Sequence, residues 1–122
     1  MRTVREAMTA GAITCEMDSS IQQAAKEMRD HKVGSLIACE HGHIKGIVTD
    51  RDIVTRAIAD GASPMDAKVS DVCTSEVATI GPSESVEHAL EVAHERHVRR
   101  LPVVEDGQPI GVLSLHDLAV AS

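Results

Sequence analysis

Two octamers that pair a hydroxyl with a carboxylate are the residues of this chain best suited to chemistry. The first, Gly46–Ile53, reads GIVTDRDI, and the second, Gly111–Leu118, reads GVLSLHDL. Each carries a glycine, two aliphatic residues, a hydroxyl residue, two variable residues and an aspartate. A carboxylate accepts two hydrogen bonds from a vicinal diol, and a hydroxyl beside free helix N–H groups suits a phosphate. The octamers therefore indicate ribose-phosphate sites.

The same spacing also has a structural interpretation, a capping box that opens a helix. Thr49 with Asp52, and Ser114 with Asp117, fit an N-cap hydroxyl followed three residues later by an acid. Capping boxes prefer Glu or Gln, because the side chain must reach back, whereas both octamers use the shorter Asp. A strand that leads directly into a helix N-terminus also presents N–H groups to an anion. Both observations favour a site.

An internal repeat organises the elements that must position these residues. Shifted by 65 residues, Val4–Ile53 aligns with Val69–Leu118 without a gap, and eleven of the 50 aligned pairs are identical. Two copies of one unit suggest a pseudo-twofold pair, a shorter array than a solenoid. We expect a first repeat at 1–61, a connector at 62–68 that carries Pro64, and a second repeat at 69–122.

Each copy predicts the element order β-α-β-β-α. In the first copy, a short strand at 13–15 precedes a helix capped by Ser20, with Gln23 at the capping-box position. Strands at 35–39 and 45–48 follow around a turn at Gly42, and a last helix runs from Thr49 to about Asp60. The second copy repeats these elements 65 residues later. The predicted fold class is α/β, two β-α-β-β-α repeats packed sheet to sheet, because each sheet otherwise keeps one bare face.

Composition narrows the class of ligand and the compartment. The chain has 12 Lys and Arg against 19 Asp and Glu, a formal net charge of −7, which disfavours nucleic acid. It has no Phe, Tyr or Trp, so a bound base would rest on aliphatic side chains. No apolar run approaches the roughly 20 residues that span a bilayer, and no signal-peptide core follows the N-terminus. We expect a cytoplasmic protein that does not bind membranes.

The cysteines and two histidines give a weaker indication of redox or metal chemistry. Cys15, Cys39 and Cys73 are too few for a disulfide framework, and we expect them to be small buried hydrophobes. Cys39, His41 and His43 alternate like metal ligands, but they span the predicted turn and the second copy does not repeat them. A redox or metal-responsive module using Cys15, Cys39 and His41 stays an alternative. No nucleophile elbow or phosphate-binding loop is present, so we predict no enzyme.

The octamers, the stretch HVRRLPVV at 97–104 and the tandem repeat together resemble the cystathionine-β-synthase (CBS) domain pair, or Bateman module, in its small stand-alone bacterial form. The resemblance covers about 4–121. It implies a non-catalytic energy or cofactor sensor that binds AMP, ADP or ATP in the cleft between the repeats and requires no cofactor. It also implies a homodimer and an unidentified regulated protein; a ligand-free dimeric scaffold is the alternative. Helix packing in the dimer would use the small residues Ala24, Ala25, Ala89 and Ala93.

The resemblance also implies the ligand contacts. Asp117 would hold one ribose, with Ser114 and Arg100 near its phosphates. Asp52 and Thr49 would serve a second ribose-phosphate. The base of the first ligand would rest on Ala12, Ile13, Val33 and Gly34, and the base of the second on Val77, Ala78, Val98 and Arg99.

These two sites are expected to differ in strength. Arg99 and Arg100 align with Gly34 and Ser35, so the first repeat lacks the basic pair. An anionic ligand on an acidic protein needs compensating charge. The Asp117 site is therefore expected to be the tighter one.

Overall fold

The computed structural model describes residues 2–75 and 77–114, which fold into two compact units. Unit 1 comprises Met1–Ala12 and Val77–Ser122, and unit 2 comprises Ile13–Glu76. Each unit therefore holds the body of one repeat and the first segment of the other repeat. We call Val4–Ala10 leader 1, which lies in unit 1, and Val69–Thr74 leader 2, which lies in unit 2.

A three-stranded sheet forms the centre of unit 2. Strands β2 (Thr14–Glu16), β3 (Ser35–Glu40) and β4 (His43–Thr49) lie in that order, with β2 parallel and β4 antiparallel to β3. His41 and Gly42 both have positive φ, 52° and 79°, as a tight hairpin turn requires. The predicted strands and turn are confirmed, with ends that differ by one or two residues.

The helices of unit 2 follow the predicted order with two local differences. Helix α2 (Ile21–His31) begins where Ser20 Oγ accepts the Gln23 N–H at 3.1 Å. The Gln23 amide instead donates to Glu27, so the expected capping box is incomplete. The last helix starts as predicted, as α3 (Asp50–Asp52), but continues as a π-helix, η1 (Ile53–Ile58).

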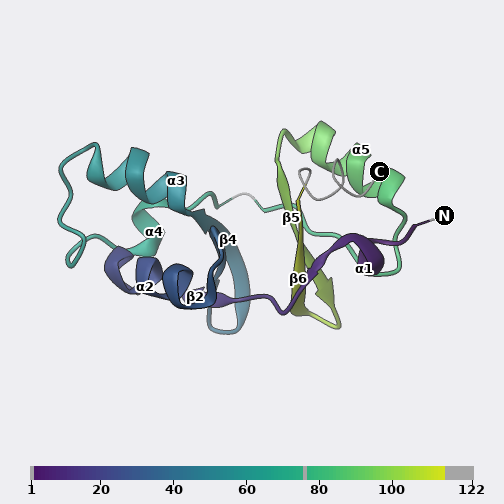
Figure 1. Ribbon diagram of the computed structural model, residues 1–122, viewed down its shortest axis with the longest axis horizontal. Helices are drawn as coiled ribbons and strands as arrows, with labels where there is room; N and C mark the ends of the chain where they lie inside the picture. Colours follow the sequence, from purple (N-terminus) through teal and green to yellow (C-terminus); the bar gives the residue numbers. More distant parts are fainter. Residues whose placement is uncertain (1, 76, 115–122) are drawn as a thin grey trace. The chain divides into compact units, whose positions relative to one another are not determined.

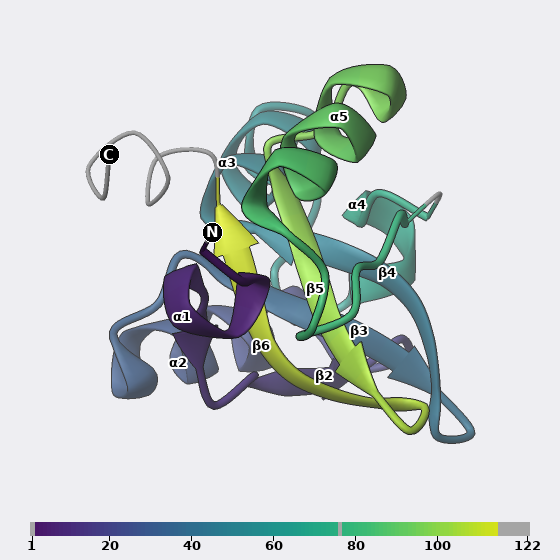
Figure 2. The ribbon, with the colours of Figure 1, turned by 90° about the vertical axis from the view of Figure 1, so that its right-hand side faces the viewer.

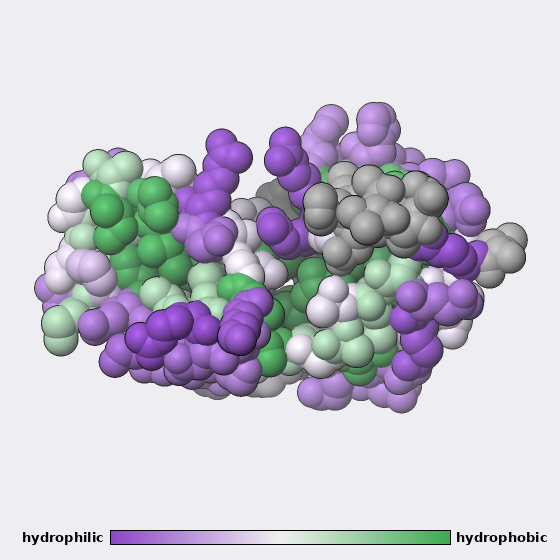
Figure 3. All heavy atoms as spheres, viewed as in Figure 1, coloured by the Kyte–Doolittle hydropathy of each residue, from purple (hydrophilic) through white to green (hydrophobic). Residues whose placement is uncertain are grey.

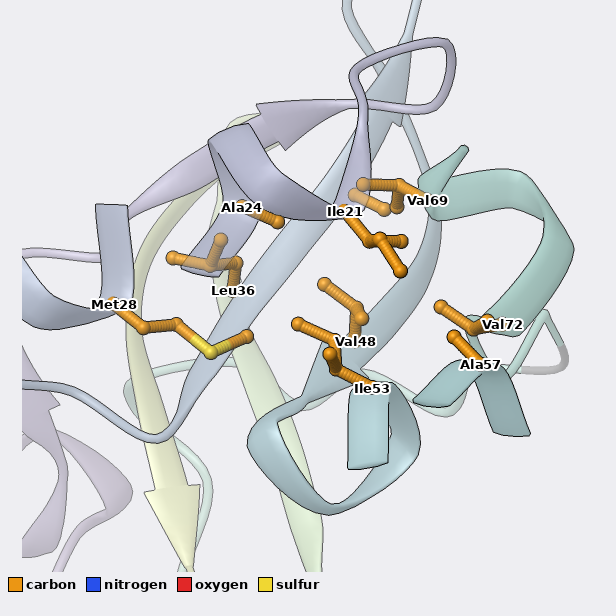
Figure 4. Packing of buried hydrophobic residues seen from close by; sticks show 10 residues of the cluster. Ile21, Ala24, Met28, Leu36, Val48, Ile53, Ala57, Val69 and Val72 are labelled. Atoms are coloured by element: carbon orange, nitrogen blue, oxygen red, sulfur yellow. The ribbon is translucent and has the colours of Figure 1, made fainter. Parts of the chain in front are cut away.

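Leader 2 completes the hydrophobic core of unit 2. Its short helix α4 (Val69–Val72) buries Val69 and Val72 against a cluster that includes Ile21 and Val48. Figure 4 shows these side chains from α4, α2 and β4 pointing toward one another, together with Ile53 and Ala57 of η1. At its end, Thr74 pairs with Ile47 of β4 through two backbone hydrogen bonds of 2.9 and 3.0 Å. The core of the first repeat is therefore closed by residues from the second.

Unit 1 is built in the same way around leader 1. Helix α1 (Val4–Ala7) and strand β1 (Thr9–Ala10) precede helix α5 (Val86–Arg96) and strands β5 (Arg100–Glu105) and β6 (Gln108–Ser114). The sheet order is β1-β6-β5, so its edge strand comes from the leader (Figures 1 and 2). The strand predicted at 78–80 contributes one parallel bridge, from Ile80 to Val103.

The core of unit 1 uses the alanines that were expected to pack between protomers. Ala89 and Ala93 of α5 are 0% and 2% exposed and contact the cluster that contains Val4 and Leu101. Ala24 of α2 is equally buried in unit 2. Of the four small residues, Ala25 alone is exposed. The expectation that these alanines serve a dimer interface is wrong, because three of them fill their own cores.

Candidate functional site

The first octamer turns from strand β4 into helix α3 through a complete capping box. Thr49 Oγ1 accepts the Asp52 N–H at 3.0 Å, and Asp52 Oδ2 accepts the Thr49 N–H at 3.0 Å. The shorter aspartate therefore reaches back, and the argument that its length disfavours a cap is wrong. The box fixes both side chains where the sheet ends.

The box still leaves one oxygen of Asp52 available. Oδ1 takes no part in the box and lies 3.8 Å from Nε of Arg56, beyond hydrogen-bonding distance. The Asp52 side chain is 16% exposed. An ionised carboxylate has about four lone-pair positions, so one bond to its own helix does not exhaust Asp52 as an acceptor.

The first-turn N–H groups, in contrast, all have partners within the fold. The Asp50 N–H donates to Gly34 O at 3.0 Å, the Arg51 N–H to Asp50 Oδ1 at 2.8 Å and the Asp52 N–H to Thr49 Oγ1. The expectation that this helix start presents free donors to a phosphate is therefore wrong. Phosphate recognition needs other groups.

Unit 2 gathers its sequence-predicted contact residues at one end of the sheet. Ser35, the first residue of β3, is opposite Thr49, the last residue of β4, and Gly34 accepts the hydrogen bond from Asp50. Val33 is half-buried just before them, and Ile13 borders the start of β2, accepting from Ile37 at 3.0 Å.

Sequence reasoning missed Asp50 at this end of the sheet. Its Oδ2 lies 3.4 Å from the position that a Cβ atom would take at Gly34. In the sequence, Asp50 is a variable position of the octamer, because Leu115 aligns with it in the second copy. Only the fold brings its carboxylate against a residue sixteen positions earlier.

Unit 1 brings together several of the contact residues that the sequence predicts around the second octamer. Arg100 and Ser114 are opposite each other in the β5–β6 ladder, and Arg99 and Arg100 are exposed. Val98 is half-buried and follows His97, which ends α5 with a left-handed φ of 55°. Ala12 and Val77 are also half-buried, and Ala78 is buried. Asp117 lies outside the described residues.

The glycine that opens each octamer has a packing role that the sequence did not reveal. At Gly46, a Cβ atom would lie 2.6 Å from the carbonyl oxygen of Thr74. At Gly111, it would lie 2.6 Å from the carbonyl oxygen of Thr9. Thr9 and Thr74 are an identical pair of the repeat and lie at or next to the ends of the two leaders. Each glycine therefore lets a leader lie against the strand that carries the hydroxyl.

The three cysteines all lie in unit 2 and have free thiols. Burial, with the nearby Cys39 and Cys73, raises the pKa of Cys15 to about 12. Burial also raises the pKa of Cys39 and of Cys73, whose thiol lies 3.7 Å from the sulfur of Met17. Because the thiolate is the reactive form, these environments make the thiols poor nucleophiles at neutral pH.

The described ranges contain neither a three-residue cluster suited to a metal ion nor a helix suited to crossing a membrane. Cys39, His41 and His43 lie along the β3–β4 hairpin. Within residues 2–75 and 77–114, no three His, Cys, Asp or Glu side chains are grouped so that they could hold a metal ion. Nor does any helix in these ranges have the length and apolar character needed to cross a membrane.

A family model described as CBS domain matches residues 4–58 and 69–122, the two copies of the repeat. The chain belongs to the CBS domain family. The CBS domain pair that the sequence resembled is thereby confirmed, and pairs of this kind are typically regulatory and non-catalytic. Each CBS match contains one octamer and begins with one leader.

The chain is similar over nearly its whole length to curated proteins of two bacteria. It is 37% identical over 123 residues to the CBS domain-containing protein YhcV of Bacillus subtilis, covering 98% of this chain and 85% of that protein. It is 31% identical over 120 residues to hypoxic response protein 1 of Mycobacterium tuberculosis, covering 98% and 84%.

Solved structures are also similar to this chain in fold and sequence. The crystal structure of hypoxic response protein I with two coordinated zinc ions has a TM-score of 0.82 and 30% identity, covering 99% of both chains. A hexameric CBS-CP12 protein from bloom-forming cyanobacteria has a TM-score of 0.89 and 27% identity, covering 99% of this chain and 68% of that one. Oligomers therefore occur among similar CBS proteins.

Proposed function

We propose that this CBS domain pair is a non-catalytic sensor that binds an adenosine-containing ligand of the AMP, ADP or ATP class with residues of both repeats. The proposal depends on the position and hydrogen bonding of the Asp52 carboxylate. Its capping bond fixes the carboxylate at the end of the sheet and leaves Oδ1 outside the box. A fixed acceptor of this kind can bind a ribose hydroxyl without first losing side-chain freedom.

Arginine side chains are the proposed phosphate ligands beside the second octamer. Arg99 and Arg100 are exposed at the start of β5, and Arg100 is opposite Ser114 in the ladder. A guanidinium group binds phosphate through paired N–H donors. Asp117, which follows Ser114 by three residues, is the proposed ribose acceptor of this second set.

The alternative ligands have less support on this chain. Zinc is bound by hypoxic response protein I. The described residues here include no three-residue cluster suited to a metal, and we do not extend zinc to this protein. A redox function would need a reactive thiolate, whereas burial raises the pKa of Cys15 and Cys39.

Calorimetry and thermal unfolding with AMP, ATP, S-adenosylmethionine and NADH test the proposal. A ligand present at 100 times its Kd should stabilise the protein by about 2.7 kcal/mol. Asp52→Asn should weaken binding while keeping an oxygen for the cap. Asp71→Asn is the matched control, because Asp71 makes the same backbone bond, to the Lys68 N–H at 2.9 Å, outside the octamers.

Two results would contradict the proposal. Absence of stabilisation by every adenosine compound at millimolar concentration would identify a ligand-free scaffold. Equal loss of affinity in Asp52→Asn and Asp71→Asn would show that the octamer carboxylate has no special part in binding.

A further inference from the structure

One side chain in unit 2 contacts both the octamer carboxylate and leader 2. Arg56 Nη1 donates to the carbonyl oxygen of Val72 at 3.1 Å, and Arg56 Nε lies 3.8 Å from Asp52 Oδ1. The guanidinium group is planar and directs its donors along fixed, different directions, so a single arginine can connect two acceptors. The Arg56 side chain is 52% exposed, so it has room to move when either of its two neighbours changes.

Leader 2 is attached to the rest of unit 2 by apolar packing and by strand pairing. Val69 and Val72 bury their side chains in the unit 2 core, and Thr74 exchanges two backbone hydrogen bonds with Ile47. Ile47 is two residues before Thr49 on the strand that carries the octamer. Leader 2 and the first octamer are therefore linked in two ways. Strand β4 pairs with the leader and carries the octamer, and Arg56 contacts both.

The thiol of Cys73 lies close enough to Asp52 and Arg56 for both charges to affect its pKa. Burial is the main cause that raises its pKa, and the Asp52 carboxylate raises it further, while Arg56 lowers it. Cys73 belongs to leader 2, so the leader lies within the field of both charged side chains.

We propose that Arg56 is a positioning residue that couples Asp52 to leader 2: held by the Val72 carbonyl oxygen, it keeps its positive charge beside Oδ1 of Asp52, so that ribose binding at the first octamer and docking of leader 2 favour each other. This inference rests on the proposed function in taking Asp52 as a ribose acceptor. It is specific to the first repeat, because the residue that aligns with Arg56 in the second is Ala121. By linkage, any gain in ribose affinity from a docked leader equals the gain in docking from bound ribose.

Hydrogen–deuterium exchange of the Ile47 and Thr74 amides measures leader docking without ligand, because each N–H group donates to the carbonyl oxygen of the other residue only while the leader is in place. Arg56→Met should raise their exchange rates about fivefold, the loss of one ordinary hydrogen bond. Asp52→Asn keeps a cap acceptor but removes the charge that faces Arg56, and should raise the same rates. The double variant should exchange no faster than Arg56→Met.

Two further variants separate positioning from simple structure. Arg56→Lys restores a cation beside Asp52 and should return the rates toward those of the unaltered protein. Arg29→Met removes an exposed arginine of α2 in the same unit, paired with Asp30 at 2.9 Å, and should change neither rate. Two results would overturn the inference: additive effects of Arg56→Met and Asp52→Asn in the double variant, or exchange rates in Asp52→Asn equal to those of the unaltered protein.

The ligand arm uses AMP on the full chain. AMP should slow exchange of the Ile47 and Thr74 amides in the unaltered protein and lose that effect in Arg56→Met, although AMP still binds. AMP that binds with equal protection in both proteins would refute the coupling. If calorimetry detects no AMP binding, the proposed function fails, while the ligand-free variants still decide whether Arg56 and Asp52 act together on the leader.

Discussion

The carbonyl oxygen of Thr74 lies 2.6 Å from the position that a Cβ atom would take at Gly46. Thr74 ends leader 2, and Gly46 opens the first octamer, so these residues meet where the second repeat contributes to the unit that contains the first. The same relationship joins Thr9 and Gly111. The glycine of the octamer is thus required for close backbone approach.

Gly46→Ala and Gly111→Ala should each destabilise the protein. A Cβ atom at 2.6 Å from a backbone oxygen forces the leader or the strand to move, at a cost of about 1–3 kcal/mol. Gly81→Ala is the control, since its Cβ atom would meet only the Glu84 side chain at 3.7 Å. Denaturant midpoints measure the difference; equal midpoints for all three variants would contradict it.

Replacing the left-handed residue at the end of α5 should raise stability. His97 has φ of 55°, a conformation that costs little for glycine and more for residues with a Cβ atom. His97→Gly should gain about 0.5–1 kcal/mol. His94→Gly, three residues earlier inside the helix, should lose about the same amount. A shift of the thermal midpoint in the same direction for both variants would show this account to be wrong.

The thiol of Cys15 should make stability fall at alkaline pH. Its pKa is raised in the folded state to about 12 from 9.0, mainly by burial, so the folded protein retains a proton that the unfolded chain releases. This contribution is complete below pH 9 and is lost as the pH rises from 9 toward 12. Cys15→Ala should flatten the decline in the unfolding midpoint between pH 9 and 11. An unchanged slope would exclude Cys15 as its source.

The two octamers should contribute unequally to nucleotide binding. Asp117→Ala should weaken AMP binding more than Asp52→Ala, because the exposed Arg99 and Arg100 belong to the repeat that contains Asp117. The loss of the hydrogen bonds to a diol corresponds to about 1–3 kcal/mol. Calorimetric titration of both variants measures it, and equal losses would refute the inequality.

The protein should be a homodimer, and η1 offers a surface for it. Val54 and Ile58 are 58% and 49% exposed on successive turns, and Figure 3 shows apolar atoms at the surface of unit 2. Val54→Glu should shift the mass measured by light scattering at micromolar concentration toward the monomer. Met65→Glu is the control, since Met65 is 72% exposed on the segment after η1. A monomeric unaltered protein would contradict the expectation.

Local patterns along the chain were sufficient to predict most helices and strands and part of the candidate site. The strands, the hairpin turns at Gly42 and Gly107 and the starts of α2 and α5 follow from apolar spacing, turn residues and the capping serines. The hydroxyl–carboxylate pair of the first octamer was also evident from its repetition. The sequence argument against a cap was wrong. A general preference for Glu at the third helical position does not determine whether one particular Asp side chain can reach the N-cap N–H.

Tertiary structure alone decided which repeat each leader joins. Leader 1 and leader 2 have the same pattern in sequence, and each could equally follow its own repeat or cross to the other. Strand pairing at Thr74 and Thr9, with burial of Val69 and Val4, selects the crossed arrangement. Periodicity specifies which face of a segment is apolar, but not which distant surface covers it, because that choice depends on contacts far apart in the chain. The contacts of Asp50 with Gly34 and of Arg56 with Val72 arise for the same reason.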